Sequence, residues 1–166
     1  MAGITDAEFL NKVIPYGFDA VTLGGYSLDE KTVEASLKII KRGRKEFHFE
    51  LDEIIPHIEN EVNLIKKTHP DVRVSANVRS TTPEPIIEAS RIKNLDIIEI
   101  NCHCRQEEIT SIGCGQEMLK RPDLVDFISK IVDDAESEVS VKIRANVEGI
   151  DTFFLFFQEN QLNYFQ

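Results

Sequence analysis

The stretch Asp96-Ile-Ile-Glu-Ile-Asn-Cys-His-Cys-Arg105 is the part of the sequence around which the rest is arranged. Its apolar first half is typical of a buried strand, and its second half becomes polar at Asn101. Polar residues continue to Pro122, and apolar residues then recur at helical spacing from Leu124 to Val132. We therefore predict a buried strand that delivers Asn101 and two cysteines into a loop, followed by a helix.

Strand-like and helix-like segments alternate along the rest of the chain. Gly24 and Gly25 are predicted to end the first strand. Alternation at this spacing indicates parallel βαβ units with right-handed crossovers. The sequence therefore predicts an α/β fold, either a doubly wound sheet or part of a (β/α)8 barrel. We predict strands at residues 19–23, 72–78, 97–101 and 139–144, and helices at residues 4–17, 30–42, 51–67, 82–92 and 124–132.

Three polar residues are predicted near the carboxyl ends of strands, where both of these architectures collect their ligands. They are Asn77, Asn101 and Arg144. The alternative for the two asparagines is a structural role, in which they cap the strand ends. Lys142 lies in the apolar strand 139–144, and an unpaired buried ammonium is costly, so we favour a functional origin for it.

Composition limits the class of protein. With 166 residues, 42% apolar and 29% charged, the chain is expected to form one water-soluble domain with no membrane span. The first residues lack the features of a signal peptide, and three cysteines fit a reducing cytoplasm. A net charge of −10 disfavours broad nucleic-acid binding. The densest basic cluster is Lys38, Lys41, Arg42, Arg44 and Lys45, for which the alternative is the solvated end of a helix.

Residues 151–166 break the alternating pattern. They contain Phe153-Phe-Leu-Phe-Phe157 and end in a sequence similar to the protease cleavage site of expression tags. We therefore predict a domain over residues 1–150 and an atypical aromatic tail over residues 151–166. No metal site is predicted. Cys102, His103, Cys104 and Cys114 have suitable side chains, but they lack the paired spacing of structural zinc sites.

The run from Asn101 to Pro122 resembles the flavin-dependent tRNA-dihydrouridine synthase family. The corresponding family stretch is Ile-Asn-x-Gly-Cys-Pro, then a glycine, a leucine pair and Pro-(Asp/Glu)-Leu. Aligned without gaps, Cys104 falls on the catalytic cysteine, Gly115 on the loop glycine and Met118-Leu119 on the leucine pair. Three other segments, which extend the resemblance over about residues 1–150, agree: Met1-Ala-Gly-Ile-Thr-Asp6, Pro83-Glu-Pro85 with Ala89 and Arg91, and Val141-Lys-Ile-Arg144.

The resemblance implies an incomplete TIM barrel, with about strands 1–5 of eight, and FMN at its carboxyl-end mouth. In the family, FMN exchanges a hydride with C6 of uracil, and the cysteine protonates C5. Cys104 is thereby implied as the acid, and a thiol is mostly protonated at neutral pH. The implied cofactor-binding residues are Met1, Ala2, Asn77, Asn101 and Lys142, and the implied substrate-binding residues are Asn101 and Arg144.

The implied partners are tRNA or a small pyrimidine as substrate and NAD(P)H as reductant. An incomplete barrel leaves two sheet edges open, and unpaired edges invite partner strands. We therefore expect a homo-oligomer.

The sequence also departs from the family pattern. Its Gly-Cys-Pro turn is His103-Cys104-Arg105 here, and a flavin-binding glutamine is shortened to Asn77. Nothing after Arg144 resembles the sixth to eighth strands, whose Gly-rich loops hold the FMN phosphate. FMN is therefore expected for full-length family members, whereas this chain alone lacks those loops. The alternative is a non-catalytic or non-flavin TIM-barrel relative.

Overall fold

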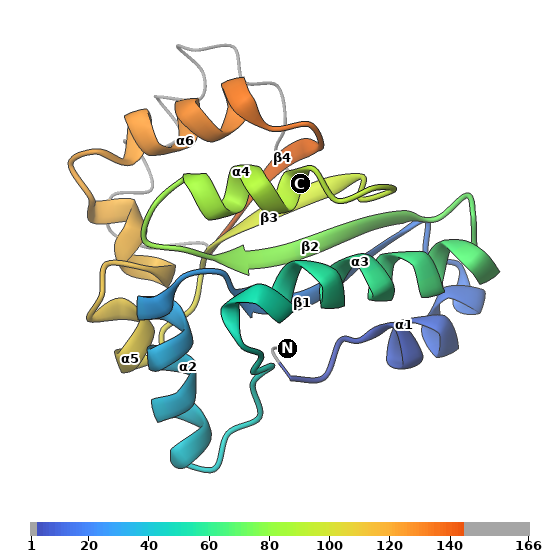
Figure 1. Cartoon of the computed structure of the whole chain (residues 1–166), viewed down its shortest axis with the longest axis horizontal. Coiled ribbons are helices and arrows are strands. Elements are labelled where there is room, and N and C mark those ends of the chain that lie inside the picture. The colour runs from blue at the N-terminus through green and yellow to red at the C-terminus, as the bar shows by residue number, and fades with distance from the viewer. Residues whose placement is uncertain (1–2, 145–166) are drawn as a thin grey trace.

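A parallel sheet of four strands forms the centre of the computed structural model, which describes residues 3–144 (Figure 1). The strands are β1 (Ala20–Ser27), β2 (Arg73–Arg79), β3 (Ile97–Cys102) and β4 (Glu138–Ile143). They pair in the order β1-β2-β3-β4. This sequential order is that of a (β/α) barrel, whereas a doubly wound sheet reverses direction at a switch point. The predicted α/β fold of partial-barrel type is confirmed.

The predicted helices are all present in the predicted order, although their ends differ by a few residues. The first is shorter than predicted because Asp6 caps it, its Oδ1 accepting a hydrogen bond from the Phe9 N–H at 2.8 Å. The short helices α5 and η2, in the loop after β3, were not predicted. The helices are α1 (Ala7–Val13), η1 (Ile14–Tyr16), α2 (Glu30–Lys41), α3 (Leu51–Thr68), α4 (Glu84–Ser90), α5 (Glu107–Thr110), η2 (Gly115–Lys120) and α6 (Leu124–Asp134).

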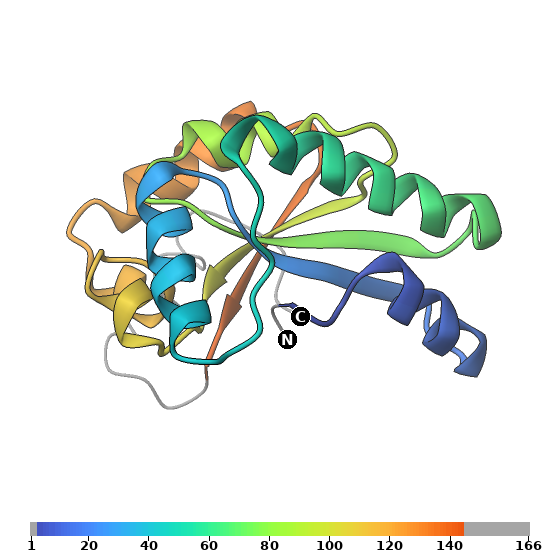
Figure 2. The same cartoon turned by 60° about the horizontal axis from the view of Figure 1, so that its bottom comes forward.

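The sheet has one apolar face and one polar face. Helices α3, α4 and α6 cover the apolar face (Figure 2). Every second strand residue packs beneath them, as shown by Val74, Ala76, Val78, Ile98 and Ile100, which are at most 1% exposed. The intervening positions are polar at Ser75, Asn77, Arg79, Glu99 and Asn101. Because strand side chains alternate between faces, these polar residues all lie on the side that becomes the interior of a barrel.

Strand β1 differs from its prediction. It does not end at Gly24-Gly25 but continues to Ser27, and its register with β2 shifts between Gly24 and Tyr26. Glycines inside a strand often mark such an irregularity rather than a terminus. A Cβ on Gly25 would lie 2.7 Å from Oδ1 of Asn77, so this position requires a residue without a side chain.

The N-terminal segment contributes a bridge rather than the end of a first barrel strand. Thr5 pairs antiparallel with Gly24, and its Oγ1 donates to the Gly24 carbonyl at 2.6 Å. Met1, Ala2 and the aromatic tail lie outside the described residues. Within residues 3–144, β4 has no partner strand on its outer edge, and the expected homo-oligomer stays a prediction. No helix in that range is long and apolar enough to cross a membrane.

Candidate functional site

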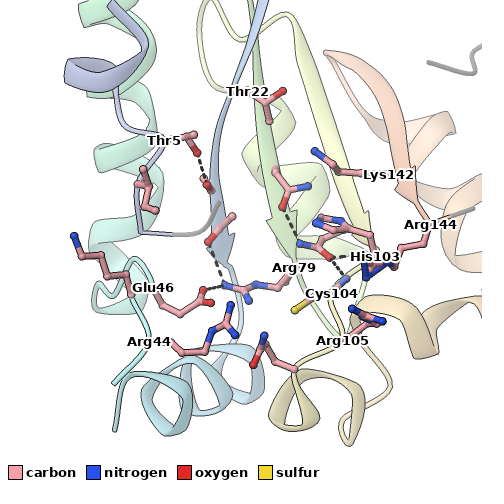
Figure 3. Close-up of a pocket in the computed structure, with 17 residues that line it drawn as sticks. Thr5, Thr22, Arg44, Glu46, Arg79, His103, Cys104, Arg105, Lys142 and Arg144 are labelled. Atoms are coloured by element: carbon pink, nitrogen blue, oxygen red, sulfur yellow. Dashed lines mark hydrogen bonds and ion pairs between the residues drawn. The ribbon is translucent and has the colours of Figure 1, made fainter. Parts of the chain in front are cut away.

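A cavity of about 790 Å³ lies on the polar face of the sheet (Figure 3). Its walls come from all four strands, from the N-terminal segment, from the α2–α3 linker (residues 42–50) and from the loop after β3. This volume lies in the range of small-molecule sites. Five of the residues selected from the sequence line it together: Asn77, Asn101, Cys104, Lys142 and Arg144. The other two, Met1 and Ala2, lie outside the described residues.

Four side chains form a polar row on the polar face of the sheet: Asn77, Glu99, Asn101 and Lys142. All of them except Glu99 line the cavity. Asn101 Nδ2 donates to Asn77 Oδ1 at 2.8 Å, and Asn77 Nδ2 donates to Glu99 Oε1 at 2.7 Å. Lys142 Nζ lies 3.6 Å from the same Glu99 oxygen. The row therefore connects β2, β3 and β4 on their polar face.

Sequence reasoning missed Glu99. A signal was present, because Glu99 is the one charged residue within the apolar strand 97–101 and shares the alternation of Asn101. Lys142 also differs from its interpretation as a buried residue. Its side chain is 40% exposed and points into the cavity from β4.

Asn101 also holds the loop that contains Cys104. Its Oδ1 accepts hydrogen bonds from the Cys104 N–H at 3.1 Å and from the His103 N–H at 3.4 Å. The capping alternative is therefore correct for Asn101, which caps β3 and also belongs to the polar row. It is wrong for Asn77, which lies two residues before the end of β2.

Gly115 fixes the other side of the cysteine. Its φ is +61°, and a Cβ there would lie 3.0 Å from the Cys104 Cβ and closer still to the Cys104 carbonyl oxygen. The same carbonyl accepts a hydrogen bond from the Gln116 N–H at 2.8 Å. Cys104 is thus held between the end of β3 and the start of η2, with its free thiol half-buried.

The other two thiols are unsuited to chemistry in the cavity. Burial raises the pKa of Cys102 far above its ordinary value and raises the pKa of Cys114 to about 12. Both side chains are buried, and neither lines the cavity. Across residues 3–144, no group of three histidine, cysteine or acidic side chains is placed to hold a metal ion.

The cavity is basic although the chain is acidic. Among the described residues that line it, one is acidic, Glu46, and six are basic: Arg44, Lys45, Arg79, Arg105, Lys142 and Arg144. A concave surface with one sign of charge concentrates the local field, so this site attracts anions despite the net charge of −10.

His103 responds to this field. Burial, followed by the positive charges of Lys142 and Arg144, lowers the pKa of His103 to about 4. The imidazole at the cavity wall is therefore neutral at physiological pH. Its Nδ1 is buried and has no hydrogen-bond partner within the described residues.

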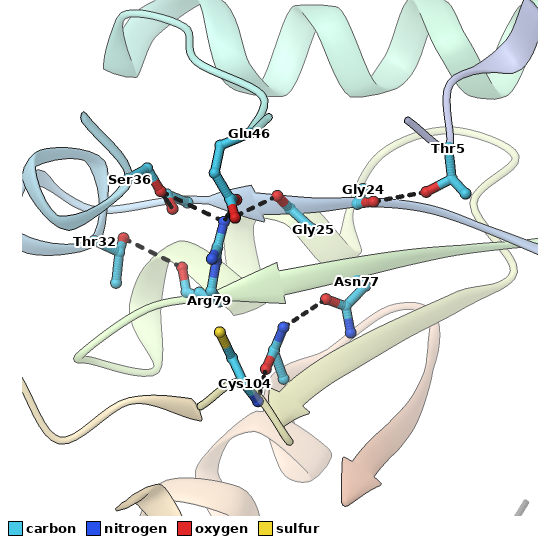
Figure 4. Close-up of polar contacts among 11 residues, drawn as sticks. Thr5, Gly24, Gly25, Thr32, Ser36, Glu46, Asn77, Arg79 and Cys104 are labelled. Atoms are coloured by element: carbon cyan, nitrogen blue, oxygen red, sulfur yellow. Dashed lines mark hydrogen bonds and ion pairs between the residues drawn. The ribbon is translucent and has the colours of Figure 1, made fainter. Parts of the chain in front are cut away.

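A buried ion pair anchors the α2–α3 linker to the sheet (Figure 4). Arg79 Nη2 donates to Glu46 Oε2 at 2.6 Å and to the Gly25 carbonyl at 3.1 Å. The two charged side chains are only 1% and 6% exposed. Sequence reasoning missed this pair, whose members come from a linker and a strand 33 residues apart.

We predict that Glu46→Gln lowers the free energy of unfolding by about 3 kcal/mol, because it leaves the buried guanidinium of Arg79 without its counter-charge. Urea unfolding measures this change. The control is Glu8→Gln, whose side chain is 82% exposed in its pair with Lys12. That variant is expected to lose about 0.5 kcal/mol or less. Equal losses of unfolding free energy in the two variants would contradict the claim that the buried Arg79–Glu46 pair anchors the linker.

We predict that Gly115→Ala is more destabilising than Gly113→Ala. Both glycines have positive φ, so each substitution has a backbone cost of about 1 kcal/mol. A Cβ on Gly113 meets nothing within 4 Å, whereas one on Gly115 collides with Cys104. Only Gly115→Ala is expected to alter the rate at which Cys104 reacts with a thiol reagent. Unchanged reactivity in that variant would show that the glycine does not position the cysteine.

We predict that NMR titration gives His103 a pKa near 4, assigned with a His103→Gln variant. The folded-state pKa lies below the ordinary value of 6.5, so the stabilisation from the neutral ring is present above that value. It is lost as the pH falls from 6.5 towards 4. Lys142→Gln is expected to raise the pKa of His103, because a nearby positive charge is removed. A His103 pKa that Lys142→Gln leaves unchanged would refute this electrostatic account.

Comparison with known proteins shows what this chain is similar to. The uncharacterized protein MJ0144 of Methanocaldococcus jannaschii is 42% identical to this chain over 149 residues, which are 88% of the chain and 56% of that relative. The chain thus spans little more than half of the relative's length. A solved 2,3-dimethylmalate lyase, described as a PEP mutase/isocitrate lyase superfamily member, is 13% identical. Its TM-score is 0.47, with coverage of 96% of this chain and 51% of the lyase.

The architecture is assigned from the strand order and not from the similarity to the lyase. A protein-family model supplies the family. The model described as Dihydrouridine synthase (Dus) matches residues 51–158, a range that includes the polar row, the Cys104 loop and β4. The chain therefore belongs to the dihydrouridine synthase family.

Proposed function

We propose that this chain provides the catalytic side of an FMN-dependent oxidoreductase related to tRNA-dihydrouridine synthase. The reaction adds a hydride at C6 and a proton at C5 of a uracil-like ring, or removes them. The observation that supports this most directly is the connection of the Cys104 loop to Lys142 through one row of side chains, joined by hydrogen bonds and, at Lys142, by an ion pair. That row places a thiol and a cation on the same cavity.

The residues on the polar face fit the ring of FMN. Gly25 leaves backbone without a side chain beside Asn77, which suits a flat ligand. Within residues 3–144, Asn101 Nδ2 has a second hydrogen without an acceptor, and the only ion pair of Lys142 is long, at 3.6 Å. An amide donor and a weakly held ammonium thus face the cavity, as a flavin pyrimidine ring requires. When bound, FMN supplies or accepts the hydride at C6.

The roles of the chain's own residues follow from this placement. The Cys104 Sγ–H donates its proton to C5 of the substrate ring, and the resulting thiolate is reprotonated from solvent. Lys142 stabilises negative charge at the flavin position. Asn101 orients both the Cys104 loop and the bound rings, and Arg144 contacts the substrate. The backbone of Met1 and Ala2 completes the cofactor contacts in this proposal, and NAD(P)H provides the electrons.

We predict that Cys104→Ala and Lys142→Met separate chemistry from binding. FMN titrated into the protein, followed by quenching of flavin fluorescence, measures affinity. Reduction with NADPH in the presence of uridine or transcribed tRNA measures turnover. Cys104→Ala is expected to keep its FMN affinity within about twofold and to lose about a hundredfold in turnover. Lys142→Met is expected to weaken FMN binding by about tenfold, because a charge-assisted contact is lost.

Lys93→Met is the matched control, because Lys93 is exposed and does not line the cavity. Full turnover by Cys104→Ala would exclude this cysteine as the acid. A protein with no measurable affinity for FMN would instead favour the non-catalytic or non-flavin barrel relative.

A further inference from the structure

The mouth of the cavity is bordered by two segments that Arg42 clamps together. These are the α2–α3 linker and the loop after β3. Arg42 Nε donates to Glu108 Oε1 at 2.5 Å, and its Nη2 donates to Glu108 Oε2 and Gln106 Oε1, both at 2.9 Å. A two-pronged contact between guanidinium and carboxylate fixes orientation as well as distance. The two borders of the mouth therefore hold a defined spacing.

Each border contains an arginine between anchored neighbours. Arg44 follows Arg42 and precedes Glu46, which the buried guanidinium of Arg79 holds. The Gly3 backbone packs against the same part of the linker, since a Cβ on Gly3 would lie 2.7 Å from the Glu46 nitrogen.

Arg105 is placed in the same way on the opposite border. It follows Cys104, whose N–H is bound by Asn101, and precedes Gln106, which is bound by Arg42. Both arginines are therefore attached to backbone that the structure fixes.

No side chain in the described part of the protein neutralises these two guanidinium groups. Within residues 3–144, neither Arg44 nor Arg105 has a hydrogen bond or ion pair, and the nearby carboxylates of Glu46 and Glu108 are each taken by another arginine. Figure 3 shows Arg44 and Arg105 on opposite sides of the cavity at the end where Cys104 lies. A lone surface arginine is ordinarily just solvated, but two unpaired arginines on anchored backbone, both lining one basic cavity, offer the charged donors that a phosphate accepts.

We propose that Arg44 and Arg105 form a phosphate subsite at the mouth of the cavity, so that the substrate is a phosphate-bearing pyrimidine nucleotide. This inference rests on the proposed function, because it assigns the substrate class of that site. The phosphate belongs either to a free nucleotide or to an RNA chain. The net charge of −10 opposes long polyanions outside the cavity, which favours the free nucleotide.

Isothermal titration calorimetry with uridine 5′-monophosphate and with uridine tests the subsite. The wild-type protein is expected to bind the monophosphate about tenfold more tightly than uridine. The double variant Arg44→Gln/Arg105→Gln is expected to bind the two ligands equally. The control variant Lys67→Gln/Lys93→Gln removes the same charge from exposed positions that do not line the cavity, and it is expected to keep the preference. Circular dichroism verifies that both double variants fold.

One further ligand identifies the source of the phosphate. A uridine-containing RNA stem-loop that depends on Arg44 and Arg105, when the monophosphate does not, would support the same subsite with RNA as the source. FMN affinity measured in parallel separates this inference from the proposed function, since a subsite for substrate phosphate leaves FMN binding unchanged. The inference is overturned if the double variant weakens FMN binding alone, or if it binds both the monophosphate and the RNA stem-loop as tightly as the wild-type protein does.

Discussion

The buried hydrogen bond between the amides of Asn101 and Asn77 is the contact on which the site depends. It connects two neighbouring strands on the face of the sheet that helices leave uncovered. Through its own oxygen, Asn101 continues this contact to the Cys104 loop, and through its nitrogen, Asn77 continues it to Glu99. An unpartnered amide in a buried position is costly, so the two asparagines support one another. The remaining parts of the site are arranged around this pair.

The opposite face of the sheet makes this arrangement possible. Apolar strand residues packed under α3, α4 and α6 give the sheet its stability and fix the strand positions. With the strands fixed, the polar face is free to hold side chains selected for binding rather than for packing. Positive charge is in excess on that face, because the carboxylate of Glu46 is paired with Arg79 and that of Glu99 accepts a hydrogen bond from Asn77. The resulting cavity has a surplus of positive charge inside an acidic protein.

Local patterns predicted much of this structure. Alternation of apolar residues located the strands, and the carboxyl-end rule placed Asn101 and Arg144 beside one cavity. The predicted carboxyl end of β1 was wrong, because glycines are found both at the ends of strands and at irregularities inside them. Lys142 was interpreted as buried because a strand pattern does not show whether one face is left open. The Arg79–Glu46 pair and the Arg42–Glu108 contact join residues far apart in sequence, and no local pattern encodes such contacts.

A double-mutant cycle on the two asparagines tests this account most directly. The free energy of unfolding is measured for the wild-type protein, Asn77→Ala, Asn101→Ala and the double variant. If the amide pair holds the polar face together, each single variant leaves the partner amide buried without its hydrogen bond. The double variant is then less destabilised than the sum of the two, by about 1–2 kcal/mol. Losses that add within about 0.3 kcal/mol would contradict the claim that this contact organises the site.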